Sequence, residues 1–302
     1  MRVFLAGATG VIGSPLVPQL IKAGHEVTAM TRSVLRARQL EALGAYPVVC
    51  DVFDADVVRA AIADASPDAI IHQLTSLPPR LDWSNPHLFD HHNRVRTEGA
   101  RILVDAALAT GATRVVAQSI AFVYAPAGDL VKDEDAALFT DAPPPLGGTV
   151  AAVVELEQLV TGTAGVEGLV LRYGMLYGPG TYHDRLGSTA ADIIAARVPL
   201  AAGATGMYSW LHVADAASAA VAALERGSPG IYNVVDDEPA PQPEWLPVLA
   251  QALGADPPVA AEIPPESPDM WLRGASNAKA KRELGWRPRY ASWREGFAAS
   301  LA

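Results

Sequence analysis

The sequence predicts an α/β fold with a doubly wound parallel sheet and a smaller C-terminal lobe for the substrate. A short apolar run at Val3–Ala6 is followed by Gly7, Gly10 and Gly13 at a spacing of three, and then by an amphipathic pattern to Lys22. Strand and helix patterns then alternate along the chain, which is typical of a Rossmann-like sheet. The chain has 302 residues, 50% of them hydrophobic, enough for one full core and a substantial lobe.

The first elements form the order strand, glycine turn, helix, strand, with the second strand in "AGHEVTAM" at 23–30. Glycines let the backbone approach a pyrophosphate, whose charge is then held by free N–H groups at the start of the helix. The flanking strand and helix favour a dinucleotide site over a tight turn that binds nothing.

The end of the second strand indicates which dinucleotide is bound. An acidic residue there would bind a ribose 2'-hydroxyl, whereas this chain has Thr31, Arg32 and, one turn later, Arg36. Two cations suit a 2'-phosphate. The sequence therefore favours NADP(H) over NAD(H); the alternative is that Arg32 is an ordinary solvated surface residue.

Later elements continue the alternation. Helix patterns follow Asp51, end near Thr110, and follow the proline-rich loop at 143–145. Because the carboxyl ends of parallel strands lie at one edge of a sheet, ligands are expected there. We predict a nucleotide domain at 1–174 and a mainly substrate-binding lobe at 175–302, with some segments returning to the nucleotide domain. The predicted strands after the second lie at 45–50, 67–76, 114–119 and 169–180.

Charge and cysteine content exclude several classes of partner. A formal net charge of -10 gives no electrostatic reason to bind nucleic acid or an anionic membrane, and no apolar stretch approaches the ~20 residues that span a bilayer. The single Cys50 cannot form an internal disulfide, and the first residues do not resemble a secretion signal. We expect a cytoplasmic protein with a small-molecule substrate, and a homodimer is left open.

Six segments together resemble the extended short-chain dehydrogenase/reductase family, the NAD-dependent epimerases and dehydratases. They are "GATGVIG", "CDVFD", "IIHQL", "LRYGMLYGPG", "WLHVADAASA" and "ASNAKAKRELGWRP", in the family's order. The resemblance implies a phosphate-binding turn, a pair that brackets the adenine, and a residue over the ribose. Those residues are, in turn, Gly7, Thr9, Gly10, Val11 and Ile12, then Asp51 and Val52, then Leu74; Gln118 and Tyr173 complete the predicted cofactor set.

The resemblance also implies a catalytic Tyr with a Lys four residues later, and this chain lacks both. Thr149 and Val153 occupy the matching positions. The chain has four lysines, and none follows a tyrosine at that spacing. Thr149 is too weakly acidic to replace a phenol, whose reference pKa is ~10, so we interpret it as a helix N-cap.

Three other residues are candidates for the chemistry. The family's substrate-binding hydroxyl falls at Ser119 or, without a gap, at Ile120; Ser119 is preferred. Tyr124 is the candidate replacement acid, with a packing aromatic as the alternative. His183, on a glycine-flanked loop, titrates near neutral pH and is a candidate acid or base, unless it is simply solvated. The adjacent His91 and His92 lack metal-ligand spacing, so no metal is expected.

The C-terminal part indicates the substrate class. Between Tyr173 and Leu272 there are only three arginines and no lysine, too few to hold a sugar nucleotide's pyrophosphate, although Arg273 follows directly. Tryptophans and methionines there, Trp210, Trp245, Trp271, Met207 and Met270, suggest an apolar cleft or ordinary core. We expect an NADP(H)-dependent oxidoreductase for a small uncharged or aromatic carbonyl or enone. The alternatives are a non-redox isomerase, cyclase or lyase, and a non-catalytic cofactor sensor.

Overall fold

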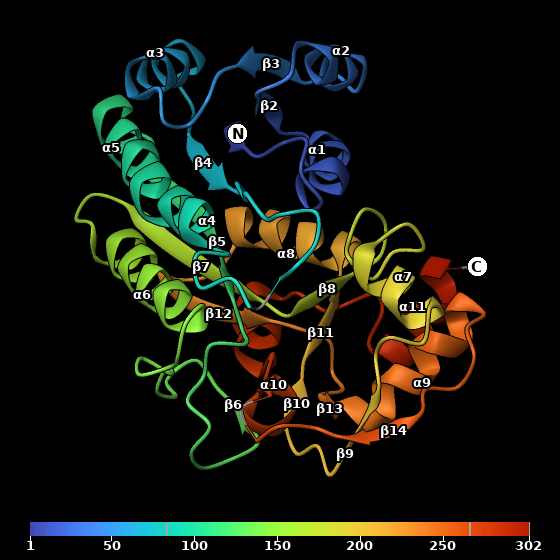
Figure 1. Cartoon of the computed structure of the whole chain (residues 1–302). Helices are drawn as coiled ribbons and strands as arrows, with labels where there is room; N and C mark the ends of the chain where they lie inside the picture. The colour runs from blue at the N-terminus through green and yellow to red at the C-terminus, as the bar shows by residue number, and fades with distance from the viewer. Residues whose placement is uncertain (83, 266, 302) are drawn as a thin grey trace.

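The computed structural model describes every residue except 83, 266 and 302, and it confirms the predicted α/β class (Figure 1). Seven parallel strands form one sheet in the order β12-β7-β5-β4-β1-β2-β3. The order reverses between β1 and β4, which is where open sheets of this type bind ligands. The strands are β1 (Arg2–Ala6), β2 (Glu26–Thr31), β3 (Tyr46–Val49), β4 (Ala69–His72), β5 (Arg114–Ile120), β7 (Glu167–Tyr173) and β12 (Gly230–Val234).

Helices cover both faces of the sheet, because alternate residues of each apolar strand point to opposite sides. In β1, Val3 and Leu5 belong to one apolar core, and Phe4 and Ala6 to the other. The first core is covered by α1 (Gly13–Lys22), α2 (Val34–Ala42) and α8 (Val213–Glu225). The second is covered by α3 (Ala55–Ala65), α5 (Ala100–Thr110) and α6 (Leu146–Gly162).

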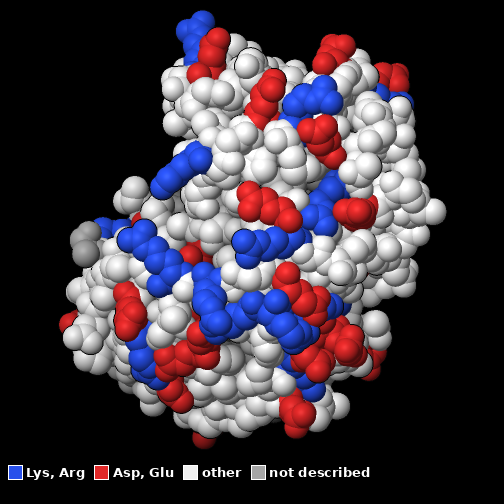
Figure 2. Space-filling model, turned by 180° about the vertical axis from the view of Figure 1, so that it is seen from behind, with Lys and Arg blue, Asp and Glu red and all other residues white. Residues whose placement is uncertain are grey.

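Two short segments lead into α5, namely α4 (Asp90–Arg94) and the π-helical η1 (Val95–Gly99). The η1 segment packs against α6 beside the sheet. Nowhere in the described chain is a helix long and apolar enough to cross a membrane. On the face seen in Figure 2, Lys and Arg side chains lie among Asp and Glu side chains, so this face carries no continuous surface of one sign.

A smaller lobe packs below the carboxyl ends of the strands (Figure 1). Its centre is aromatic: Trp210 is fully buried, and its ring centroid lies 4.9 Å from that of Trp245. These two tryptophans are therefore core residues rather than parts of an open cleft. The lobe's main helices are α7 (Ser188–Ile194), α9 (Gln242–Leu253) and α11 (Trp293–Leu301). Its short strands pair as β8 (Met175–Tyr177) with β11 (Trp210–His212), β9 (Leu200–Ala202) with β14 (Ala260–Glu262), and β10 (Met207–Tyr208) with β13 (Ala240–Pro241).

Near the lobe's junction with the sheet lie α10 (Pro268–Trp271) and the pair β6 (Val131–Lys132) and β15 (Gly274–Ala275). Three elements that follow residue 175 belong to the large sheet and its cover, namely α8, β12 and the π-helical η2 (Ala280–Leu284). The boundary between 174 and 175 stays a prediction.

The strand predicted at 169–180 is divided at Gly174. A Cβ at this position would lie 2.6 Å from the carbonyl oxygen of Ser209, so only glycine fits. The Gly174 N–H donates to Val234, whereas the Met175 N–H donates to Ser209. The chain thus changes hydrogen-bonding partners here, and it places Met175 beyond the carboxyl edge of the large sheet.

The structure corrects the prediction that Thr149 caps a helix. Helix α6 begins at Leu146, with Pro145 as its N-cap, so Thr149 lies inside the helix. The glycine pair at 147 and 148 has low helix propensity and suggested a later start. However, Gly147 lets the helix press against the preceding loop, because a Cβ there would lie 2.3 Å from the Ala142 carbonyl oxygen.

Candidate active site

A cavity of about 200 Å³ opens at the carboxyl ends of β1, β2 and β4. It gathers most of the predicted cofactor residues in one place, although these come from separate segments of the chain. The predicted residues that line it are Gly7, Thr9, Gly10, Arg32, Arg36, Asp51, Val52 and Leu74. Its position at the reversal of strand order is that of a dinucleotide site.

The glycine turn beneath the cavity has no room for side chains. Gly7 has φ +94°, and a Cβ on it would lie 2.5 Å from the Gln73 carbonyl oxygen. A Cβ on Gly13 would lie 2.1 Å from the carbonyl oxygen of Gly7, so α1 presses against the turn. No side chain caps the start of α1, and the positive end of a helix suits a phosphate. Val11 is exposed beside the turn and Ile12 is buried under it.

Two arginines stand at the end of β2. Arg36 donates from Nη1 to the carbonyl oxygen of Thr9, at 3.0 Å, and so braces the turn. Arg32 is mostly exposed, and its Nη1 lies 4.0 Å from the Asp51 carboxylate across the cavity. Thr31 also lines the cavity, with its hydroxyl 3.4 Å from that of Thr9. This part of the cavity thus has cations and hydroxyls that could bind an anionic group.

Gln118 and Tyr173 hold the inner rim of the cavity. Gln118 donates to the carbonyl oxygen of Leu74 at 2.6 Å, and Gln73 donates to the Tyr173 hydroxyl at 3.0 Å. Tyr173 is buried, which raises the pKa of its phenol above the ordinary range. Gln73 lines the cavity and its Oε1 has no partner, so it is a further candidate for cofactor binding that the sequence analysis did not name.

The predicted pair Ser119 and Tyr124 is joined through a buried ion pair. Arg172 donates to both carboxylate oxygens of Glu157, at 2.8 and 2.7 Å. Ser119 donates to the same carboxylate at 2.9 Å, and Arg172 also donates to the Tyr124 hydroxyl at 2.9 Å. Tyr124 in turn donates to Asn233 at 2.6 Å. Burial raises the pKa of Tyr124 to about 12.

In this network both predicted hydroxyls already have protein partners in the core, which does not favour contact with a substrate. Their catalytic role stays a prediction, and the structure supports the packing alternative for Tyr124. The sequence offered one signal for the network: Arg172 interrupts the apolar run of a strand, and a buried charged residue is usually paired.

His183 lies in the lobe and is buried, so the solvated alternative considered from the sequence does not apply. Its Nδ1 is 2.9 Å from the Leu176 carbonyl oxygen, which can only accept, and its ring meets Trp210 edge-on at 4.9 Å. Burial lowers the pKa of His183 to about 4. The imidazole is therefore neutral at pH 7 and poorly suited to act as an acid; its catalytic role stays a prediction.

Buried polar atoms without partners surround the junction of β4, η1 and α6. They include Nε2 of His72, Nε and Nη1 of Arg96, and Oγ1 of Thr149. Arg96 is only 5% exposed, although it carries a charge. Burial, and secondarily the nearby Arg96, lower the pKa of His92 to about 2. No spacing motif in the sequence marks Arg96 as unusual.

Val153 and Thr149, at the positions where the resemblance implies Lys and Tyr, are both buried on α6. Val153 packs among apolar residues of the loop that precedes the helix. Within the described part of the chain, no cluster of side chains has the composition of a metal site.

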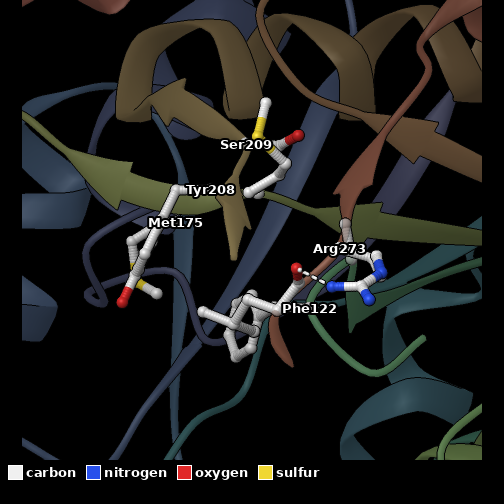
Figure 3. Close-up of a pocket in the computed structure, with 9 residues that line it drawn as sticks. Phe122, Met175, Tyr208, Ser209 and Arg273 are labelled. Atoms are coloured by element: carbon white, nitrogen blue, oxygen red, sulfur yellow. Dashed lines mark hydrogen bonds between the residues drawn. The ribbon is translucent and has the colours of Figure 1, made fainter. Parts of the chain in front are cut away.

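A second cavity lies at the carboxyl ends of β5 and β7, where the substrate is expected (Figure 3). Its volume is only about 10 Å³. Arg273 is the charged residue in its wall, and its guanidinium lies across the cavity from Met175 and Tyr208 (Figure 3). The lining residues are Ala121, Phe122, Gly174, Met175, Met207, Tyr208, Ser209, Leu272 and Arg273.

Two other arginines of the lobe, Arg185 and Arg197, are engaged elsewhere. Arg185 donates to the Leu301 carbonyl oxygen, and Arg197 pairs with Asp192 at 2.5 Å. The wall of the second cavity is thus mainly apolar with one cation.

Known proteins resemble this chain over most of its length. It is 48% identical to the 3-diazoavenalumate denitrifying reductase of a Streptomyces species, covering 98% of this chain and 99% of the relative. It is 25% identical to the 2-alkyl-3-oxoalkanoate reductase of Stenotrophomonas maltophilia, covering 84% and 76%.

Among solved structures, the UDP-glucose 4-epimerase of Thermus thermophilus in complex with NAD is 24% identical, with TM-score 0.78 and coverage of 100% and 98%. The epimerase of Thermotoga maritima with UDP-glucose has TM-score 0.80 at 19% identity, covering 100% and 97%. These likenesses support the fold. The model of the NAD dependent epimerase/dehydratase family matches residues 3–234. The chain belongs to the NAD dependent epimerase/dehydratase family.

Proposed function

We propose that this protein is an NADPH-dependent reductase that transfers a hydride to a small aromatic diazo compound. Two observations together carry the proposal: the chain has an open cavity where a dinucleotide would bind, and it is 48% identical to a reductase over nearly its whole length. The cofactor, when bound, supplies the hydride. The chain's own residues bind and orient it: the glycine turn and α1 receive the pyrophosphate, and Asp51 and Leu74 face the adenosine half.

The preference for NADPH rests on the two cations at the end of β2. Arg32 lines the cavity with most of its side chain exposed to an incoming ligand, and Arg36 is anchored to the turn. A 2'-phosphate gains charge-assisted hydrogen bonds there that a 2'-hydroxyl does not. The solved epimerase of Thermus thermophilus contains NAD, but that observation describes the cofactor of that protein.

The absence of the Tyr and Lys pair supports a diazo substrate. Hydride addition to a carbonyl creates an alkoxide, which needs a positioned proton donor. Hydride addition to the terminal nitrogen of an arenediazonium ion instead gives a neutral aryldiazene. Its carbon–nitrogen bond then breaks, the hydrogen moves to the ring carbon, and the arene and N₂ are released. No alkoxide forms, so Thr149 and Val153 suffice where a ketone reductase needs Tyr and Lys.

A carbonyl substrate is the second candidate, because the Stenotrophomonas relative is named for the reduction of a 3-oxoalkanoate. In that reaction water would have to supply the proton, since the nearer phenols are buried and hydrogen-bonded and Thr149 is too weakly acidic.

The experiment is to follow the absorbance of NADPH with an arenediazonium carboxylate, an aryl ketone, and neither. We expect oxidation of NADPH and formation of the arene with the diazonium compound only. Gly7→Ala, which blocks the turn with a Cβ 2.5 Å from a carbonyl oxygen, controls for spontaneous decay of the diazonium ion. Turnover of the ketone but not of the diazonium compound would contradict the diazo substrate and support the carbonyl substrate.

We also propose a cytoplasmic location, supported by the buried, unpaired Cys50. The homodimer considered from the sequence stays a prediction.

A further inference from the structure

We propose that Arg273 binds a carboxylate of the substrate, so that the enzyme acts on aryl acids and selects them against their esters. This inference deepens the proposed function and rests on it for the identity of the reaction. It concerns the second cavity, at the carboxyl ends of β5 and β7 (Figure 3).

Backbone carbonyls fix the Arg273 guanidinium in place. Nη1 donates to the carbonyl oxygens of Trp271 and Leu272, at 2.9 and 3.0 Å, and Nη2 donates to that of Pro126. A guanidinium has five N–H donors, so two remain. One of these is Nε, which is buried and has no partner. The remaining donors can form a two-point contact with a carboxylate, the geometry that arginine favours.

A second feature of Arg273 is that the described residues around it supply no opposite charge. Throughout the described residues, no carboxylate lies within 4.0 Å of its guanidinium, in contrast to the buried Arg172, which pairs with Glu157. Asp269 is close in sequence, but its carboxylate accepts from Tyr208 at 2.6 Å and from Ser267 at 3.3 Å. A partly buried cation held only by neutral carbonyls is stabilised by an incoming anion.

The cavity beside Arg273 suits a carboxylate attached to an apolar body. Its volume of about 10 Å³ holds about one water molecule, which is space for a carboxylate oxygen but not for a ring. Phe122, Met175 and Met207 form its apolar wall. Methionine side chains rearrange easily, so they provide the room that an aryl group needs. Gly174 and Ala121, which follow β7 and β5, place this cavity at the sheet edge that also binds the cofactor.

One cation matches a monocarboxylate better than a diphosphate. Arg185 and Arg197 are held by Leu301 and Asp192, so neither supplements Arg273. A sugar nucleotide would bring two charged phosphates to a wall with a single guanidinium. Binding of UDP-glucose is therefore an outcome that the test must include.

Binding to the unreactive NADP⁺ complex tests the inference without requiring turnover. Calorimetry compares cinnamate with methyl cinnamate, and Arg273→Met with the wild type. We expect Arg273→Met to weaken cinnamate binding by about 10- to 100-fold and methyl cinnamate binding by less than ~3-fold. The matched control is Arg114→Met, because Arg114 also donates to three backbone carbonyls, those of Leu224, Arg226 and Gly227. This control should leave the preference for the acid unchanged.

Equal losses for acid and ester in Arg273→Met would overturn the inference and show that Arg273 only holds the loop carbonyls. Wild-type affinity for UDP-glucose equal to or above that for cinnamate would also overturn it. Failure of the proposed function has a different signature: cinnamate binds in an Arg273-dependent manner, yet no diazonium compound oxidises NADPH.

Discussion

At the residue scale, we expect Arg32, directly after β2, and Arg36, in the first turn of α2, to have separable effects on cofactor binding. Arg32 lines the cavity with its Nη1 4.0 Å from the Asp51 carboxylate, whereas Arg36 donates to the Thr9 carbonyl oxygen in the turn. We predict that Arg32→Ala weakens NADPH binding by about 10- to 100-fold and leaves NADH binding unchanged. Arg36→Ala should weaken both. Fluorescence titration of each variant with each cofactor measures this, and equal losses for Arg32→Ala would reject its role at the 2'-phosphate.

Two buried arginines should respond to substitution with opposite signs. Arg172 is fully paired with Glu157, so Arg172→Met leaves a buried carboxylate and should cost about 3 to 5 kcal/mol of unfolding free energy. No hydrogen bond to the Arg96 side chain is found among the described residues, and Nε and Nη1 are buried. Arg96→Met should therefore stabilise the fold by about 1 kcal/mol. Urea unfolding of both variants decides; a loss above ~1 kcal/mol in Arg96→Met would show that Arg96 is compensated after all.

Residues that a local motif marks could be located from the sequence, and those held by distant partners could not. The glycine turn and the arginines after β2 belong to a strand, turn, helix and strand pattern that the sequence shows, and they line the expected cavity. Ser119 and Tyr124 are instead held by Glu157, Arg172 and Asn233, which are 38 or more residues away. Nothing in the local sequence "VVAQSIAFVY" reports those contacts.

At the element scale, the start of α1 is the most constrained helix terminus of the site. Gly13 has ordinary backbone angles, but a Cβ there would lie 2.1 Å from the Gly7 carbonyl oxygen. Gly13→Ala should therefore displace the helix and reduce NADPH affinity by more than ~10-fold. Gly162, at the end of α6, is the control, because a Cβ added there would meet no heavy atom within 4 Å. Gly162→Ala should stabilise the protein by ~0.5 to 1 kcal/mol and leave binding unchanged.

Calorimetry measures the NADPH affinity of both glycine variants, and thermal unfolding measures their stability. Retention of wild-type affinity in Gly13→Ala would show that the turn does not position the pyrophosphate.

Element boundaries were harder to predict than element types. The alternation of strands and helices indicated the correct class because apolar periodicity is a local property. The break after β7 depends on the carbonyl of Ser209, and the start of α6 depends on close packing against Ala142. Both contacts are tertiary, so a periodic pattern carries no sign of them.

At the scale of the whole molecule, buried titratable groups set the response of stability to pH. Burial lowers the pKa of His72 and His183 to about 4 and of His92 to about 2, whereas the unfolded chain has histidine pKa values near ~6.5. The unfolded state therefore binds more histidine protons below pH ~6.5, and stability should fall as pH decreases from there toward ~4.

Asp236 acts in the opposite direction. Burial raises its pKa to about 8, so the folded state binds a proton that the unfolded state lacks between pH ~4 and ~8. Above pH ~8 the folded state carries the full free-energy cost of burying the ionised Asp236 carboxylate. We predict that Asp236→Asn adds more than ~1 kcal/mol of unfolding free energy at pH 8.5 and almost nothing at pH 4. Urea unfolding at both values tests this; an equal effect at both would show that Asp236 is not protonated in the fold.

In the proposed reaction, the molecule couples its NADPH site to reductive loss of nitrogen from an aromatic diazo acid. One experiment measures both halves of this coupling: NADPH consumed and N₂ released from a ¹⁵N-labelled arenediazonium carboxylate. We predict one N₂ and one arene for each NADPH oxidised, and no enzymatic N₂ release when NADPH is omitted. Enzymatic N₂ release without oxidation of NADPH, or oxidation of NADPH without N₂, would refute the coupling.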